Sequence, residues 1–457
     1  MNVLKDSSIK KLFEINQTWL QCIYCGRKYD LLDEREFRCP ECGDLFEINH
    51  NFSFLLDSIK SLKDIFQKRT KSFSVDSSSW EKSGVWRYHE LIMPFFPKDK
   101  IVTLEEGNVP IIRAGSNLRK WIGGHEIDLW LILEGMTPTG SFKDFGGTVM
   151  ISVAKAAGIG AIICASTGDT SAMSAAYAAA AGMKCAVILP EGKVTPVQLA
   201  QPLVYGAKVI TLPGDFDDCM RVVQELVKDY GAYPSNSLNP SRIEGHQATV
   251  FQIAQFFDWE MPQWIAVPVG NGSNCSSVGK GIRLLNRLGF TQSAKDSSRI
   301  LGCQSRAANP LAKSWDVSFI NEPDSSLRKW QNNYRPVKVG ETTATAARIG
   351  DPVSRDKVMR EIILSRGAMA TAEESDLNDA VAACGKDGIF ICPQTGIALT
   401  GVRNALKKDW IQGGDRVVVV STATGLKFTQ AAAGHLEHEI IDAGSCSTKK
   451  VADILDL

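Results

Sequence analysis

Residues 137–147 read TPTGSFKDFGG and follow the apolar run LWLILEG at residues 129–135. An apolar strand, a glycine-bearing turn and a helix start, in this order, are the unit from which α/β sheets are built. Such sheets bind ligands beside the carboxyl ends of their strands, where this turn would lie. Because a lysine held there can form a covalent bond with a carbonyl compound, Lys143 is a candidate Schiff-base residue. The alternative is an ordinary exposed lysine at a helix start.

The same pattern recurs from about residue 101 onward. The run AIICAS (161–166) precedes the small-residue helix TSAMSAAYAAAAG (170–182), and KCAVILP (184–190) follows it. Other short apolar runs lack alternation, which predicts strands of a parallel sheet buried on both faces. These runs are AKVITL (207–212), QWIAVPVG (263–270), RILGCQS (299–305) and RVVVVS (416–421). The predicted fold class is α/β.

Two further turns after such strands are suited to binding anions. In CASTGDTSA (164–172), Ser166, Thr167 and the backbone N–H groups of a helix start could hold a carboxylate. Capping of that helix by Thr167 or Asp169 is the alternative. In PVGNGSN (268–274), glycines and short polar residues can form a nest of N–H donors for a phosphate. This turn lacks the GxGxxG spacing of dinucleotide-binding loops.

A fourth turn lies in VVVVSTATGLKF (417–428), where the strand ends at Ser421 and Thr422. A hydroxyl at that point can hydrogen-bond a pyridine nitrogen and leave it largely unprotonated. An ordinary strand-to-loop cap is the alternative for this turn.

The N-terminal segment CIYCGRKYDLLDEREFRCPEC contains two Cys-x2-Cys pairs separated by thirteen residues. This spacing is typical of a zinc ribbon, with Cys22, Cys25, Cys39 and Cys42 as ligands. Four thiolates leave no open position on the metal, so we predict a structural site that supplies the folding energy this polar segment lacks. A nucleic-acid-binding ribbon is the alternative, but the basic residues of the segment are offset by acidic ones.

Composition limits the classes of function. The chain has 457 residues, with 51 Lys and Arg against 51 Asp and Glu, which gives no global electrostatic reason to bind nucleic acid. The N-terminus has no apolar signal region, and no run of about 18 apolar residues occurs, so we expect a soluble protein without a membrane partner. Cys164, Cys185 and Cys392 lie in apolar runs and are expected to be buried, reduced thiols in strands, which favours the cytoplasm.

Five motifs in order, SFKDFGG, ASTGDTSA, NSLNPSRIEGHQ, PVGNGSN and STATGLKF, resemble threonine synthases, specifically the plant-type branch. The resemblance covers roughly residues 80–430. It implies fold type II of the pyridoxal-phosphate enzymes (tryptophan-synthase-β-like), with two three-layer α/β domains. We therefore expect a zinc ribbon over 1–50, an extension over 51–100, a large cofactor-binding domain over 101–136 and 236–457, and a small domain over 137–235.

The resemblance also implies a reaction, conversion of O-phospho-L-homoserine and water to L-threonine and phosphate, in a homodimer. Lys143 would carry pyridoxal 5'-phosphate as a Schiff base and act as the general base. Thr422 would face the pyridine nitrogen, and Asp169 would stand by the 3′-oxygen. The implied ligands of the cofactor phosphate are Gly270, Asn271, Gly272, Ser273 and Asn274. The implied substrate ligands are Ser166, Thr167 and Thr170 for the carboxylate, and Thr167, Lys193, Asn236 and Arg242 for the phosphate.

Three positions depart from the plant-type pattern: Thr424 stands in place of His, Phe145 in place of Leu or Arg, and His246 in place of Gln. These departures leave open a related lyase or replacement enzyme, threonine dehydratase-like or cysteate-synthase-like. Another alternative is a non-catalytic regulatory protein with a zinc ribbon on a synthase scaffold. A phosphate dianion needs fixed cationic donors, and the presence of Lys193 and Arg242 favours a phosphorylated substrate.

Overall fold

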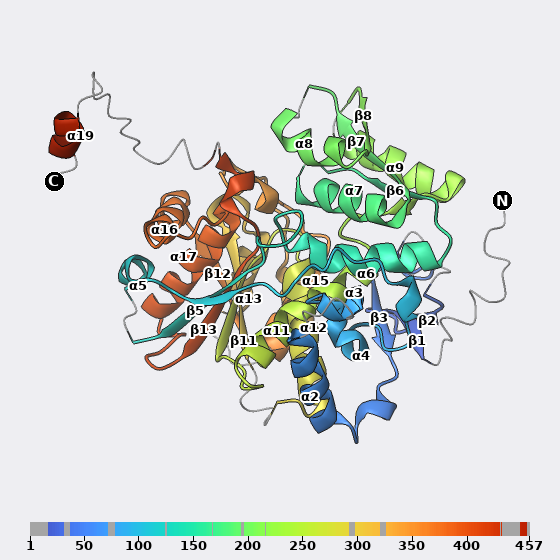
Figure 1. Cartoon of the computed structure of the whole chain (residues 1–457), viewed down its shortest axis with the longest axis horizontal. Helices are drawn as coiled ribbons and strands as arrows, with labels where there is room; N and C mark the ends of the chain where they lie inside the picture. The colour runs from blue at the N-terminus through green and yellow to red at the C-terminus, as the bar shows by residue number, and fades with distance from the viewer. Residues whose placement is uncertain are drawn as a thin grey trace.

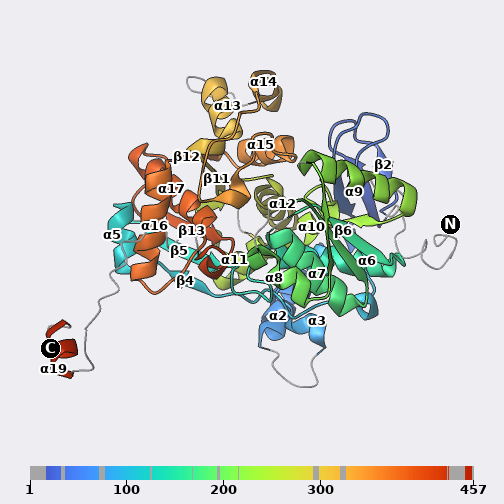
Figure 2. The ribbon, with the colours of Figure 1, turned by 90° about the horizontal axis from the view of Figure 1, so that it is seen from above.

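The computed structural model describes residues 17–31, 37–71, 78–123, 126–166, 168–192, 196–214, 216–291, 298–319, 326–429, 431 and 448–454. Within these residues the strands form a six-stranded sheet, a four-stranded sheet and a three-stranded sheet near the N-terminus (Figure 1). The helices of the four-stranded sheet lie on the opposite side of the molecule from helices α5 (Ser116–Ile122), α16 (Glu374–Lys386) and α17 (Pro393–Lys407) in both views (Figures 1 and 2). None of the helices described is long and apolar enough to cross a bilayer.

The six-stranded sheet has the order β12-β11-β10-β13-β5-β4 and is parallel except where β4 pairs with β5. Its strands are β4 (Ile111–Arg113), β5 (Asp128–Leu133), β10 (Trp264–Pro268), β11 (Arg299–Ser305), β12 (Ala368–Ala372) and β13 (Arg416–Ser421). Successive valines of β13 alternate between two cores. Val417 and Val419 belong to the core with α5, α16 and α17, whereas Val418 and Val420 belong to the core with α11, α12 and α15. The central strands are thus buried on both faces, as predicted.

The helices around this sheet include the connections between its parallel strands. They are α5 (Ser116–Ile122), α11 (Ala248–Phe256), α12 (Ser273–Leu288), α13 (Pro310–Phe319), α14 (Leu327–Asn333), α15 (Arg355–Leu364), α16 (Glu374–Lys386) and α17 (Pro393–Lys407), with short turns η7 (Arg306–Ala308), η8 (Thr345–Ala347) and η9 (Gly425–Lys427). Cys392 was expected in a strand, and this prediction is wrong. It is the residue before α17, and only its neighbour Ile391 makes an isolated bridge.

The four-stranded sheet is parallel, with the order β8-β7-β6-β9. Its elements are β6 (Ala161–Cys164), β7 (Lys184–Pro190), β8 (Lys208–Leu212) and β9 (Tyr233–Pro234), with helices α6 (Lys143–Ala156), α7 (Asp169–Ala181), α8 (Pro196–Val204) and α9 (Phe216–Tyr230). Burial on both faces was also predicted for β8, but this strand is mostly exposed. It lies at the edge of the sheet, where only one neighbouring strand covers it.

The N-terminal sheet is antiparallel, with the order β2-β1-β3, and a chain of short helices follows it. These elements are β1 (Thr18–Cys22), β2 (Lys28–Tyr29), β3 (Phe46–His50), η3 (Ser53–Leu55), α2 (Ile59–Thr70), α3 (Ser79–Lys82), η4 (Trp86–Tyr88), α4 (His89–Ile92) and η5 (Lys98–Lys100). Trp86 is buried and its Nε1 donates to Thr148 Oγ1 of α6 at 2.8 Å. This contact packs the segment around Trp86 against α6.

Helix α10 (Pro240–His246) connects β9 to α11 and packs closely against α6; α19 (Thr448–Ile454) is the last element described. Gly245 allows the close approach. A Cβ atom at this position would lie 1.9 Å from the carbonyl oxygen of Phe145, which no side chain could tolerate. The backbone of α10 therefore rests directly on the first turn of α6.

Candidate active site

Three predicted turns lie at one edge of the six-stranded sheet because the strands before them are parallel neighbours. β13 pairs with β10 on one side and with β5 on the other. Residues 270–274 follow β10, residues 134–143 follow β5, and Thr422 follows β13. The carboxyl ends of parallel strands meet at the same edge, which is where α/β proteins bind ligands.

The turn before Lys143 is tied to the turn after β13 by backbone contacts. Phe142 N donates to Thr422 O at 2.8 Å, and Thr424 N donates to Gly140 O at 3.1 Å. Between these two bonds, Ser141 forms an isolated bridge with Ala423. The structure therefore places the turn that leads into Lys143 directly against Thr422.

Lys143 is the first residue of α6, and its Nζ lies 3.6 Å from the centroid of the Phe142 ring. Burial lowers the pKa of Lys143 to about 7, and the nearby Arg242 acts in the same direction, although Asp169 opposes it. An amine with such a pKa is substantially unprotonated at neutral pH, which is the form that attacks a carbonyl carbon.

Arg242, on α10, is fully buried, yet its guanidinium is only partly paired. Nη1 donates to Ser235 O at 2.9 Å, while Nε and Nη2 have no hydrogen-bond partner among the residues described. Asn236 is similar, since its Nδ2 donates to Ala165 O at 3.1 Å and its Oδ1 is unpaired. Buried polar atoms are nearly always paired in proteins, so these unpaired atoms indicate a place for a polar ligand.

The loop over residues 270–274 leads from β10 into the sixteen-residue helix α12. Gly272, with φ of +89°, is the residue before the helix, and both polar side-chain atoms of buried Asn274 lack partners. Asn271 is held in place because its carbonyl oxygen accepts from Ser354 N at 3.0 Å. A helix N-terminus with free amide groups beside it fits the phosphate of pyridoxal phosphate.

Thr422 is buried, and its Oγ1 lies 3.5 Å from the Cys392 sulfur. A hydroxyl with so weak a partner can still bond a pyridine nitrogen. Together with the reactive amine of Lys143 and the loop over 270–274, it completes a set of residues that fits pyridoxal phosphate.

The residues predicted around the substrate carboxylate are only partly described. Ser166 is half-buried in the turn after β6, and Thr170 is buried in the first turn of α7. Thr167 and Lys193 lie outside the described residues. Asp169 begins α7, where its Oδ1 is 2.9 Å from Nζ of Lys427.

Lys427 lies at the candidate site, although its place in the motif STATGLKF predicted no role for it. Besides its ion pair with Asp169, its Nζ donates to Thr139 O and to Gln201 Oε1, each at 2.9 Å. It thereby joins the segment after β13 to α7, to α8 and to the turn before Lys143.

Glu134 was also missed, although its position directly after β5 offered a signal. Its side chain is fully buried, Thr249 donates to Oε1, and Oε2 has no partner among the residues described. Burial raises the pKa of Glu134 to about 8, while the charge of Lys143 opposes this rise. The Lys143 amine thus has a carboxyl group nearby that can hold a proton at neutral pH.

The three departures from the plant-type pattern all lie near this edge. Phe145 is fully buried on α6, and Thr424 accepts a hydrogen bond from Leu426 N at 3.3 Å. The His246 ring lies 5.0 Å from the Phe142 ring, centroid to centroid. Neither of its ring nitrogens has a partner of good hydrogen-bond geometry in the described part of the chain. Burial, with Arg242 and Lys143, holds the pKa of His246 well below its usual range.

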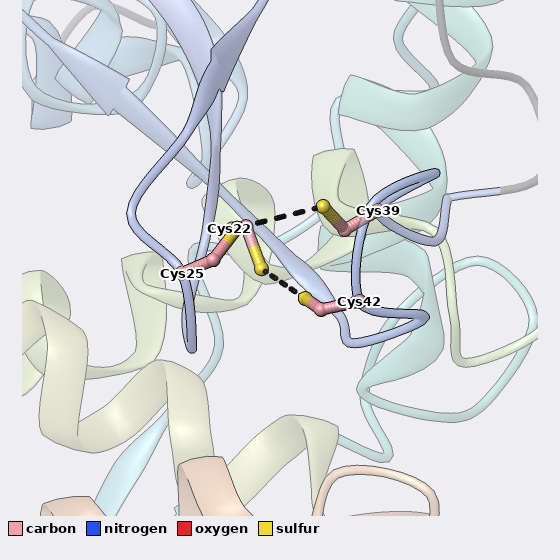
Figure 3. Close-up of side chains that lie close together, drawn as sticks. All are labelled: Cys22, Cys25, Cys39 and Cys42. Carbon is pink, nitrogen blue, oxygen red and sulfur yellow. Dashed lines mark hydrogen bonds between the residues drawn. The ribbon is translucent and has the colours of Figure 1, made fainter.

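The four N-terminal cysteines form a separate site (Figure 3). Their sulfur atoms all lie within 4.8 Å of one another, with Cys22 and Cys42 at 3.4 Å and Cys25 and Cys39 at 3.6 Å. Four converging thiols are the donor set of a closed tetrahedral zinc site, so these residues fit the metal predicted from their spacing.

Comparisons with known proteins agree with this geometry. Residues 102–423 match the family described as pyridoxal-phosphate dependent enzyme. Threonine synthase of Methanocaldococcus jannaschii is 38% identical over 413 residues, which cover 90% of this chain and 93% of that protein. Threonine synthase 2, chloroplastic, of Arabidopsis thaliana is 36% identical, over 88% of this chain and 75% of that protein.

A solved structure shows the same fold. Threonine synthase from Escherichia coli superposes with a TM-score of 0.65 at 19% identity, covering 96% of this chain and 95% of that one. This likeness confirms the predicted α/β fold of type II, and the curated relatives confirm the predicted lyase. The chain therefore belongs to the pyridoxal-phosphate-dependent enzymes and, within them, to the threonine synthases.

Proposed function

We propose that this protein converts O-phospho-L-homoserine and water to L-threonine and phosphate, with Lys143 carrying the cofactor. The observation that carries the proposal is the buried Arg242, which lies close enough to Lys143 to perturb its pKa and has two unpaired guanidinium nitrogens. A planar, fixed fork of donors beside the reactive amine suits the phosphate of a substrate. A dehydratase acting on an unphosphorylated hydroxy-amino acid would have no use for it.

Each group then has a chemical task. When bound, pyridoxal phosphate supplies an electron sink that stabilises negative charge at the substrate α-carbon. Lys143 Nζ would remove the α-proton, and its low pKa keeps it in the basic form. Arg242 and Asn236 would hold the leaving phosphate, with Thr167 and Lys193 as further ligands.

The cofactor itself would be held at both ends. The N–H groups of residues 270–274 and the free amide of Asn274 would bind its phosphate, and Thr422 Oγ1 would bond the pyridine nitrogen. Asp169 would stand by the 3′-oxygen, which places Lys427 there as well because the two side chains form an ion pair. Ser166 and Thr170 would receive the substrate carboxylate.

Further features are proposed with this function. The converging thiols of Cys22, Cys25, Cys39 and Cys42 support a structural zinc ion. The quoted motifs and the likeness to the Arabidopsis thaliana protein support assignment to the plant-type branch. A cytoplasmic homodimer stays a prediction, as do the domain limits expected from the sequence.

The test is to incubate the purified protein with O-phospho-L-homoserine and measure phosphate and threonine in the same sample. Equal amounts of the two products are expected. Release of phosphate with a keto acid in place of threonine would move the assignment to an eliminating lyase. Failure to release phosphate from this substrate would reject the proposal altogether.

A further inference from the structure

Strand β3 belongs to the N-terminal sheet β2-β1-β3, which is called the ribbon below, and it is bound to helix α10 by a buried carboxylate. Glu244 Oε2 lies 3.3 Å from His50 Nε2, and the other nitrogen of His50 lies 2.9 Å from Thr18 Oγ1 in β1. Gln247 Nε2 also donates to Glu244 Oε2, at 2.9 Å. The Glu244 side chain, which no role in the reaction explains, is therefore fixed against the ribbon.

The same carboxylate reaches helix α12. Lys280 Nζ forms an ion pair with Glu244 Oε1 and also donates to Ile48 O in β3, at 2.5 Å. Burial alone would raise the pKa of Glu244, but Lys280, with His50, keeps it below its usual value, so the carboxylate is charged. One lysine thus joins the ribbon, α10 and α12 at a single point.

A second set of contacts continues along β3. Lys357 Nζ donates to Phe46 O at 2.6 Å, and Arg360 forms an ion pair with Glu47. Both of these cations lie on α15. Arg283 of α12 joins the two helices, because it donates to both oxygens of the buried Glu361 at 2.8 Å each. Nearly every residue of β3 is thereby held by a charged side chain from the main body.

These contacts lie behind the candidate active site. Residues two apart on a helix are about 200° apart around its axis, so Glu244 and Arg242 project from opposite sides of α10. Glu244 contacts the ribbon, whereas Arg242 lies near Lys143. Lys280 lies two turns after Ser273, where α12 leaves the loop proposed to bind the cofactor phosphate. The ribbon therefore contacts α10 on the side that faces away from Arg242, and it contacts α12 two turns after the proposed phosphate loop.

The cysteine site is connected to the contacts around β3 through the residue pairs of β1 and β3. Cys22, a candidate metal ligand, is paired with Phe46 across β1 and β3, and Thr18 is paired with His50 in the same register. Tyr29 packs edge-on against Phe46, with 5.2 Å between ring centroids, and its hydroxyl lies 3.4 Å from the sulfur of Cys39. A metal that fixes the four sulfurs would fix β1 and β3 through these contacts.

We propose that Glu244 and Lys280 are positioning residues through which the metal-bound ribbon sets the spacing between Arg242 and the loop over residues 270–274. This proposal rests on the function proposed above, because that spacing must match a substrate phosphate beside a cofactor phosphate. Loosening the ribbon, by substitution or by removal of the metal, weakens the binding of phosphate ligands. It leaves the covalent attachment of the cofactor at Lys143 intact.

The test compares Glu244→Gln with the unchanged holoenzyme. We expect the Kd for inorganic phosphate and the KM for O-phospho-L-homoserine to rise about tenfold, the size of a typical coupling between two sites. We expect kcat to fall less than about threefold and the visible absorbance of the bound cofactor to stay unchanged. Lys280→Gln should act in the same direction, and the double variant should be only slightly worse than either single one, because each change already breaks the ion pair between Glu244 and Lys280.

The matched control is Glu90→Gln, which changes a carboxylate held by two Arg69 nitrogens at 2.7 and 2.8 Å, between α2 and α4. It should leave the Kd for phosphate unchanged. Removing the metal from the unchanged protein with a chelator should raise that Kd, and returning zinc should restore it. If Glu244→Gln does not fold, the removal and return of the metal still tests the inference.

Two outcomes would overturn the inference. In one, the variants lose thermal stability while the Kd for phosphate stays at its original value; in the other, metal removal leaves that Kd unchanged. A protein that binds phosphate but forms no threonine would refute the proposed function instead. The two failures are thereby distinguishable.

Discussion

The two sides of helix α10 carry buried charges that differ in how completely they are paired. On the ribbon side, Glu244 contacts His50, Lys280 and Gln247. On the side near Lys143, two nitrogens of Arg242 have no partner of good geometry among the residues described. A buried charge whose oxygens both have partners holds structure together, whereas unpaired buried groups are costly and persist where a ligand binds. The comparison separates the part of this protein that maintains the fold from the part that we propose to bind the substrate.

The largest effect on activity is expected from Lys143→Ala, in the region that Arg242 faces. In the proposed function Lys143 is both the attachment point of the cofactor and the general base, so threonine formation should fall by roughly 10³-fold or more without its amine. The visible absorbance of the bound cofactor should disappear as well. Lys155→Ala, an exposed lysine of the same helix, is the control and should change neither quantity. Full turnover by Lys143→Ala would show that the region facing Arg242 is not the catalytic site.

On the paired side, Glu244→Ala should act mainly on stability. It leaves Lys280 and His50 without their carboxylate, and breaking a buried ion pair in this way costs about 3–5 kcal/mol. Urea unfolding followed by fluorescence measures the free energy of unfolding. A loss below about 1 kcal/mol, the value of a surface pair, would show that this side of α10 does not maintain the fold.

Arg242→Met tests the contrast between unpaired and paired buried charges, because Arg242 is incompletely paired whereas Arg283 of α12 is paired with Glu361. We expect kcat/KM for O-phospho-L-homoserine to fall about 50-fold through loss of charged hydrogen bonds. The Tm of the ligand-free protein should stay the same or rise, since the variant removes a buried and incompletely paired charge. Arg283→Met, which breaks two bonds to Glu361, should lower the Tm. A Tm lowered equally by both variants would contradict the distinction.

The smallest effect concerns pH. Because burial lowers the pKa of Lys143 to about 7, its neutral amine becomes abundant between pH 6 and 8. Covalent attachment of pyridoxal phosphate to the cofactor-free protein should therefore speed up about tenfold across that interval and then level off. Stopped-flow absorbance measures the rate. An ordinary lysine would give a rate that still rises tenfold per pH unit above pH 8.

The sequence alone predicted the elements whose causes are local. β11 and β13 begin and end where the apolar runs RILGCQS and RVVVVS do, because continuous apolar residues bounded by polar ones specify a buried strand. The turn before Lys143 was predicted because it follows another apolar run of this kind. The cysteine spacing likewise foretold four sulfurs that converge.

Features that depend on distant contacts could not be predicted in this way. The exposure of β8 follows from its place at the edge of a sheet, which its own residues do not encode. Glu244 and His50 are 194 positions apart, and Lys427 is even more remote from Asp169 in the sequence. Charged residues in a sequence do not identify their partners, so both pairs became visible only in the folded chain.

The contact at Gly245 has a consequence for protein engineering. A side chain at this position would collide with the backbone of Phe145. The contact between α10 and α6 therefore does not tolerate a larger residue. Attempts to widen the substrate range by re-aiming α10 should therefore yield insoluble protein. Exchanging neighbouring side chains, His246 first among them, leaves the contact between the two helices intact. Such exchanges offer the more practical route to new substrate specificities.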